Sequence, residues 1–313
     1  MSPLLDRVRV LAAATEDTPG TAQDLDADNA AFNVFNARIQ QSATMDDRPQ
    51  QASFQHLPSA VGLISAQCTF EMEIYAGEAQ PDWASTFLAA CGLGATGTAY
   101  TFDILPPEAV GSTCKTLTLG LYEHGLRKRM RGAMGNAELR FVAGRIVRIA
   151  YTFLGVWMPP DDVASLAPTY PSDTPLRFQE SSLLVGSWSP ICQHLTLNTG
   201  NTLYLREDSA QTYGLRSTLI TDRRPTGSFN PEATLVASND VYGDWLAGTE
   251  AALAFTLNED GGDAATFAAG ACQYLNPQEA ERSGLSVDDV NFALNDDDLT
   301  ITLIPDAGSG SGS

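Results

Sequence analysis

Apolar and polar residues alternate along much of this chain in short runs, which is the pattern of β-strands with one buried face. The clearest runs are 138–141 and 148–153, on either side of an Ala143-Gly144 turn, and they predict an antiparallel hairpin. Similar runs predict further strands at 31–39, 64–74, 99–104, 115–122, 195–197, 202–205, 215–221, 233–237, 252–257, 266–274 and 299–303.

Two short helices interrupt the strands. The first is predicted at 82–91, where Asp82 is the N-cap and Gly92 ends the helix. Its apolar residues recur at helical spacing: Trp83, Phe87, Leu88 and Cys91. The second is predicted at 240–247, with Trp245 and Leu246 facing inward and Gly248 after the last turn.

The order of predicted elements is similar in the two halves, which suggests a duplicated domain. Each unit is expected to be a small β-sandwich or barrel with one flanking helix. The predicted divisions are an extended N-terminal arm at 1–55, a first β unit at 56–158, a Pro-rich linker at 159–181, a second β unit at 182–305 and a flexible Gly/Ser tail at 306–313.

The net charge of −20 over 313 residues changes the picture of possible partners. From Ala251 to the end there are 11 acidic residues and one basic residue, Arg282. An acidic surface repels nucleic acid. Two interpretations remain open. One is a solvated surface, for which the excess of Arg over Lys (16 to 2) also allows adaptation to a salty environment, and the other is a negative wall along which DNA slides without sticking.

The five cysteines and the apolar runs bear on the compartment. The cysteines are far apart with no C-x-x-C pair, which indicates buried free thiols in a reducing compartment. No apolar run approaches the roughly 20 residues that cross a bilayer. The N-terminus has no apolar signal-peptide core, so we expect no cleaved signal and no membrane contact.

One basic segment stands out against the acidic background, with Arg127, Lys128, Arg129 and Arg131. We expect it to be a loop before the 139–153 hairpin. It is either simply solvated or a contact to an acidic patch of a neighbouring subunit, and the second interpretation is favoured. Nucleic-acid binding is disfavoured because no aromatic residues are interleaved with the charges. The candidate acidic positions facing a lumen or solvent are Glu71, Glu73, Asp296, Asp297 and Asp298.

Motifs for catalysis, cofactors or metals are missing or out of context. The G-x-G-x-x-G formed by Gly92, Gly94 and Gly97 follows a helix rather than joining a strand to a helix. A calcium-like start at 24–28 lacks the turn glycine and the closing glutamate. The three histidines have no ligand spacing, and G-x-S-x-G is absent. We therefore predict no catalytic, cofactor-binding or metal-binding residues, and no enzyme.

Several stretches resemble the tail tube (major tail) protein family of long-tailed bacteriophages. They are EDTPGTAQDLDADNA at 16–30, MDDRPQ at 45–50, FLAACGL at 87–93, RKRMRGAMGNAELRFVAGRIVRIAYTFLGV at 127–156, LTLNTGNTLYLRE at 195–207 and ITDRRPTGS at 220–228. The resemblance covers nearly the whole chain, and it rests on the order and spacing of these stretches rather than on any single motif. The acidic stretch at 276–290 departs from the family pattern and leaves the loop geometry of the second unit open.

The resemblance implies a structural subunit of the virion tail, assembled in the host bacterial cytoplasm. Its rings would stack into a tube whose inner sheets form an inter-subunit β-barrel, an acidic-lined channel for DNA. Three copies of a duplicated chain would give a pseudo-hexameric ring, and six copies remain possible. Expected partners are further copies and the terminator, tape measure and distal tail proteins, with Arg127, Lys128, Arg129 and Arg131 as ring-contact candidates. The alternatives are a terminator or hub ring protein and a surface carbohydrate-binding β-sandwich.

Overall fold

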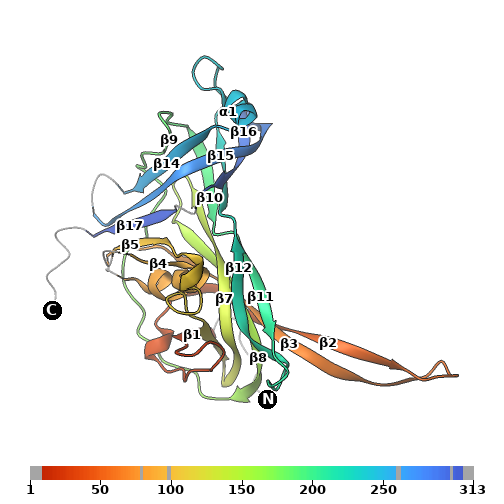
Figure 1. The fold of residues 1–313 in the computed structure, drawn as a ribbon. Coiled ribbons are helices and arrows are strands. Elements are labelled where there is room, and N and C mark those ends of the chain that lie inside the picture. Colours follow the sequence, from red (N-terminus) through yellow and green to blue (C-terminus); the bar gives the residue numbers. More distant parts are fainter. Residues whose placement is uncertain (1–8, 78–79, 97–99, 259–261, 297–298, 306–313) are drawn as a thin grey trace.

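The computed structural model describes residues 9–77, 80–96, 100–258, 262–296 and 299–305 (Figure 1). Strands dominate, and the predicted mainly β class is confirmed. The strands of the first half are β1 (Arg9–Thr15), β2 (Val34–Pro49), β3 (His56–Glu73), β4 (Leu93–Ala95), β5 (Thr101–Ile104), β6 (Leu117–Glu123), β7 (Leu126–Val142) and β8 (Arg148–Asp162). Those of the second half are β9 (Leu184–Val185), β10 (Cys192–Asn198), β11 (Asn201–Glu207), β12 (Leu215–Arg223), β13 (Thr226–Pro231), β14 (Glu250–Leu257), β15 (Ala264–Arg282), β16 (Leu285–Leu294) and β17 (Thr300–Ile304).

The centre of the molecule is an antiparallel sheet with the strand order β2-β3-β8-β7-β10-β13-β16-β15. This order contains the same arrangement twice. The first set is β2-β3-β8-β7 across the sheet, and the second set is β10-β13-β16-β15. In each set, the strand that comes fourth along the chain lies between the second and the third. In each half, a short helix and flanking strands connect the second strand to the third. The repeated order supports the predicted duplication, while the boundaries of the two units stay a prediction.

The pairing of these strands is continuous across the middle of the sheet, although several strand pairs contain a β-bulge. One row of paired residues crosses the whole sheet: Val34, Met72, Ile149, Leu139, Leu197, Gly227, Phe292 and Tyr274. Most of this row is buried in one apolar cluster that extends over both halves. The neighbouring row holds polar residues such as Glu71 and Asn198, because successive side chains of a strand point to opposite faces. The sheet therefore has one core face and one polar face.

The predicted hairpin and both predicted helices are confirmed. β7 and β8 pair with Leu139 opposite Ile149, and the chain turns at 143–144. The first helix consists of a π-helical segment, η2 (Trp83–Leu88), and a 3-10 turn, η3 (Ala89–Cys91). It ends at Gly92, whose φ of 88° few other residues tolerate. Two further 3-10 turns, η1 (Asp28–Ala30) and η4 (Pro107–Ala109), lie in loops.

The second helix, α1 (Val241–Ala247), begins as expected, since the Asp240 carboxylate accepts a hydrogen bond from the Gly243 amide at 2.8 Å. The prediction that Trp245 and Leu246 face inward is wrong. These side chains are 38% and 77% exposed, because this two-turn helix uses Val241 for its buried contact.

The first core region forms around the helix η2. Trp83 is fully buried, and its Nε1 donates to the Tyr75 carbonyl oxygen at 2.9 Å. The ring of Phe87 packs edge-on against Phe70 with 4.9 Å between centroids. Tyr151 donates its hydroxyl proton to the Trp83 carbonyl oxygen, so the helix is tied to the sheet at its first residue. Burial raises the pKa of the Tyr151 hydroxyl well above its ordinary value, and it acts as a donor.

The segment predicted as an N-terminal arm contains two strands rather than one short strand at 31–39. β1 pairs with β6 and buries Leu11 and Ala13 in the core. β2 is much longer than predicted and pairs with β3 across the expected boundary at 55–56. Together they form a hairpin whose outer part leaves the body of the molecule (Figure 1). Residues 233–237, predicted as a strand, form a loop after β13.

Candidate assembly surfaces

The polar face of the central sheet carries Glu71 and Glu73 among paired charges. Arg140 donates to Glu71 at 3.0 Å, and Arg148 lies 3.5 Å from Glu71 and 3.8 Å from Glu73. Glu138 accepts from Arg140 at 2.6 Å. Three carboxylates thus share two guanidinium groups. This part of the face is close to neutral rather than strongly acidic, which a sequence cannot reveal without the register.

Most of the other side chains on the polar face are uncharged hydrogen-bonding groups, although charged residues such as Arg38 of β2 and Asp289 of β16 also lie on it. Thr196 and Ser228 lie 2.8 Å apart across two strands, and Asn136 donates to Asn198 at the same distance. These groups satisfy one another and present hydroxyls and amides to solvent. Asp296 is not part of this face: it lies at the turn after β16 with a φ of 62°. Asp297 and Asp298 lie outside the described residues.

The basic segment with Arg127, Lys128, Arg129 and Arg131 belongs to strand β7, so the prediction of a loop is wrong. Each of its cations has a partner within the chain. Arg127 forms two contacts with Asp161, at 2.9 and 2.5 Å, and Arg129 lies 3.2 Å from the same carboxylate. The hydrogen bond from Arg127 is the main reason that the pKa of Asp161 is lowered.

Lys128 and Arg131 have partners on other elements. Lys128 lies 2.8 Å from Glu123 of β6, and its side chain is 37% exposed. Arg131 donates to the Gly20 carbonyl oxygen and lies 3.3 Å from the Gln211 side chain. The Lys128 side chain is more exposed than those of Arg127 and Arg129, so its charge is the most accessible of these three.

A buried carboxylate next to this segment holds the N-terminal part of the chain in place. Glu16 is fully buried and accepts four hydrogen bonds. Its Oε2 accepts from the Gly20 amide at 2.7 Å and from the Thr116 hydroxyl at 2.6 Å. Its Oε1 accepts from the Thr118 hydroxyl and the Gly132 amide, each at 2.8 Å. Glu16 thereby joins the 16–20 turn to β6 and β7.

The outer part of the β2–β3 hairpin exposes apolar side chains. Met45 and Val61 are opposite one another and are 57% and 58% exposed. Leu57 is also exposed, and Phe54 at the tip is fully so. Met45 and Val61 lie on the same face of the hairpin as the buried Ile39 and Cys68, whereas Leu57 is opposite Arg48 on the other face. Exposed apolar side chains that extend beyond their own core in this way are typical of a surface that another subunit covers.

A second exposed apolar surface lies at the opposite end of the molecule in Figure 1, around α1. It consists of Leu235, Val236, Tyr242, Trp245 and Leu246, of which Leu235 is 79% exposed. The two apolar surfaces together give the subunit a distinct surface at each end.

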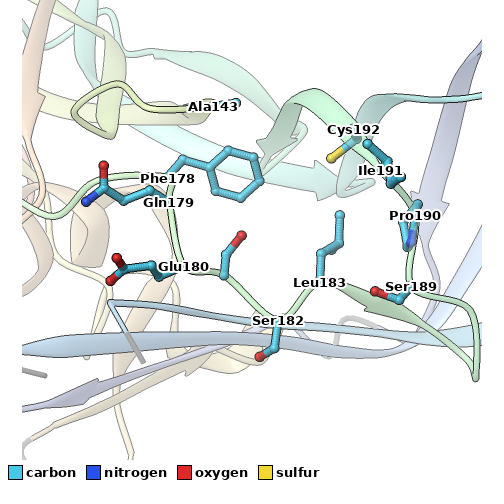
Figure 2. A pocket seen from close by; sticks show the side chains of 11 residues that line it. Ala143, Phe178, Gln179, Glu180, Ser182, Leu183, Ser189, Pro190, Ile191 and Cys192 are labelled. Atoms are coloured by element: carbon cyan, nitrogen blue, oxygen red, sulfur yellow. The ribbon is translucent and has the colours of Figure 1, made fainter. Parts of the chain in front are cut away.

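An open hollow of about 460 Å³ lies beside the start of β10 (Figure 2). Phe178, Leu183 and Cys192 point toward it, whereas the side chain of Glu180 extends away. Burial raises the pKa of the Cys192 thiol to about 11, so this thiol is protonated at neutral pH. The lining therefore has neither an activated nucleophile nor a base directed at it, and it does not form a recognisable catalytic site.

Among the described residues, no group of three or more His, Cys, Asp or Glu side chains is arranged to hold a metal ion. In the same part of the chain, no helix is long and apolar enough to span a bilayer.

The described part of the chain is a mainly β protein with a two-faced sheet and exposed apolar side chains at two of its ends. A family model described as phage tail tube protein matches residues 7–303. The chain therefore belongs to the phage tail tube protein family, as its sequence stretches predicted, and is a structural component of the bacteriophage tail. A search of the curated proteins found no match.

Proposed function

We propose that this tail tube protein assembles into closed rings that stack into a channel for DNA. The observation that carries the proposal is the central sheet, which has a core face, a polar face and two open edges among the described strands: β2 and the part of β15 beyond Gln273. Exposed edges are a template for further strand pairing, and a ring of subunits removes them. Sheets joined in this way make an inter-subunit β-barrel with the polar face inside.

The polar face suits a channel along which DNA moves. Glu71 and Glu73 would face the lumen, with their charges largely balanced by Arg140 and Arg148. Many of the remaining groups are hydroxyls and amides such as Thr196 and Asn136. A wall without excess positive charge gives DNA phosphates no counterion-releasing contacts, so the duplex is not retained.

The repeated strand order supports three chains in a ring rather than six. Each chain supplies two similar sets of strands, so three chains give six similar positions around a pseudo-sixfold axis. Six chains would be needed if only one set lined the channel. The mass of an isolated ring distinguishes these arrangements.

Contacts between rings would use the ends of the subunit. The apolar outer part of the β2–β3 hairpin is one candidate, and the segment Arg127–Arg131 with the accessible Lys128 is another. The other partners that we propose are the tail terminator, tape measure and distal tail proteins, with assembly in the host bacterial cytoplasm. We propose a structural role without catalysis, which fits a structural tail family.

Negative-stain electron microscopy of the purified protein across a concentration series, with mass measurement of any ring, tests the proposal. Hollow tubes built from stacked rings are expected. Single rings that never stack would instead indicate a terminator or hub protein. A protein that remains monomeric at every concentration and binds glycans in a screen would favour the carbohydrate-binding alternative.

A further inference from the structure

The two repeated strand sets are joined inside the chain by one strand pair. β7, the third strand of the first set, lies antiparallel to β10, the first strand of the second set. The junction contains five paired positions: Val142–His194, Phe141–Leu195, Arg140–Thr196, Leu139–Leu197 and Glu138–Asn198. Leu139 and Leu197 are buried on one side of it, and Arg140 and Thr196 lie on the polar side.

The corresponding two strands are the open edges of the central sheet. β15 is the third strand of the second set, and β2 is the first strand of the first set. Among the described strands, β2 pairs only with β3, and the part of β15 beyond Gln273 pairs only with β16. The chain thus has one completed junction of this type and the two separate halves of another.

The two sets share landmarks that match their positions. β2 and β10 each contain one extra residue near the start, between Phe35 and Arg38 and between Cys192 and Leu195. Just past the second strand, the amide of Ile74 donates to Val147 at 3.3 Å, and the amide of Ala233 donates to Ser286 at 3.0 Å. We therefore match Ile74 to Ala233 and Val147 to Ser286.

We propose that residues 278–282 of β15 pair antiparallel with residues 36–40 of β2 in the next copy of this chain, with the register of the internal β7–β10 junction. Transferring that register through the landmarks gives five pairs: Gln278–Gln40, Glu279–Ile39, Ala280–Arg38, Glu281–Ala37 and Arg282–Asn36. This inference rests on the proposed ring and defines the residues that close it.

The side chains agree with this register. Gln40 and Arg38 alternate with the buried Ala37 and Ile39, so they lie on the polar face of β2. In β15 the pattern is the same: Glu279 pairs with Asp288, whose carboxylate contacts Tyr242 of α1 on the core side, so Gln278 lies on the polar face. The transferred register therefore continues both faces of the sheet from one copy to the next.

The composition of the two edges favours pairing between unlike edges. The β15 edge carries Glu279, Glu281 and Arg282, and the Arg282 guanidinium is already paired with Glu232 at 3.0 Å. Two such edges together would therefore bring the glutamates into like-charge contact. The β2 edge carries Arg38 as its only charge between 34 and 41. Pro277, which has no amide proton, is the kind of residue found on edge strands. Unlike edges make a heterologous contact, which forms a ring when the rotation between copies closes.

Cysteine cross-linking tests the register. The variant Gln40→Cys with Gln278→Cys is prepared in a Cys192→Ser background, because the other cysteines are buried. Both glutamines are exposed in the single chain, so the variant should fold. Opposed residues of antiparallel strands have Cβ atoms about 4.5–5.5 Å apart, within range of a disulfide after small adjustments. The matched control, Gln40→Cys with Glu279→Cys, places the second thiol on the opposite face of the same strand.

Oxidation of the test pair should shift the chain from monomer to covalent dimers and trimers on a denaturing gel, and the control pair should leave it monomeric. If rings form but the test pair cross-links no more than the control, this junction is wrong while the ring proposal stands. If the wild type forms no rings and the test pair stays monomeric at the highest concentration, both proposals are wrong.

Discussion

The buried carboxylate of Glu16 holds three segments of the chain together through hydrogen bonds. It accepts two backbone amides and two threonine hydroxyls from three segments of the chain. We predict that Glu16→Ala destabilises the protein severely. The change leaves the amides of Gly20 and Gly132 without an acceptor at a site that solvent does not reach.

The magnitude follows from those two orphaned amides. An unsatisfied buried donor costs about 1–3 kcal/mol, whereas the threonine hydroxyls can rotate toward other acceptors and lose less. We expect Glu16→Ala to lower the free energy of unfolding by about 3–5 kcal/mol. Glu16→Gln should cost about 2 kcal/mol, because each carboxylate oxygen receives one backbone amide and the new NH2 group must therefore face one of them.

Urea unfolding of the unassembled protein, followed by tryptophan fluorescence and far-UV circular dichroism, measures the change. Asp17→Ala is the matched control, because Asp17 is the exposed neighbouring acid, and it should remain within about 0.5 kcal/mol of the wild type. If Glu16→Gln unfolds like the wild type, the backbone amides do not depend on the carboxylate and the reasoning is refuted.

Three further predictions concern the charged and apolar surfaces. Lys128→Ala should leave the urea midpoint nearly unchanged but shorten the tubes seen in micrographs. Arg127→Ala should lower the midpoint, because it breaks the paired contact with Asp161. Equal tube lengths for Lys128→Ala and the wild type would show that Lys128 takes no part in the ring contact. Arg127 lowers the pKa of Asp161, so the Asp161 carboxylate stabilises the protein above its unfolded pKa of about 3.9, and this stabilisation is lost as the pH falls through the lower folded pKa. Asp161→Asn should therefore reduce the free energy of unfolding at pH 7 and make its loss on acidification smaller. An unchanged pH profile of stability would contradict this prediction. Replacing Met45 and Val61 by Ser should leave rings intact but prevent stacking, with Ser42→Ala as control; normal tubes from the double variant would exclude these apolar side chains from stacking.

Local signals predicted part of the fold well. The hairpin at 139–153 combines period-two alternation with a glycine turn, and both helices end at a glycine. Asp240 caps its helix as predicted, whereas the prediction for Asp82 is wrong, because its backbone is already helical and its side chain makes no capping hydrogen bond. The same local reasoning failed for Trp245 and Leu246, because apolar character alone does not say which side of a short helix meets the core. It also failed for 233–237, an apolar run that follows its strand rather than forming one.

The assembly surfaces depended on contacts between distant positions. The basic residues at 127–131 predict a loop when they are considered alone, but Asp161 lies 34 positions beyond Arg127 and pairs with it in a strand. Likewise, Glu71 counts as an acidic lumen candidate until Arg140 and Arg148 are found beside it. Register across a sheet is a long-range property that periodicity within one strand does not specify.

The two strand sets differ in how their first two strands are connected along the chain. β2 and β3 extend into the projecting hairpin. β10 and β13 pair with each other, but the chain between them forms the β11–β12 pair, which lies against β7 and β8 (Figure 1). In a ring of three chains the lumen would look sixfold to passing DNA, but the rim would carry only three projecting hairpins. One ring could then sit on the next in three equivalent rotations, half of the six that six identical domains would allow. Fusing two copies into one chain would thus restrict the rotation of each ring relative to the next without changing the apparent symmetry of the channel.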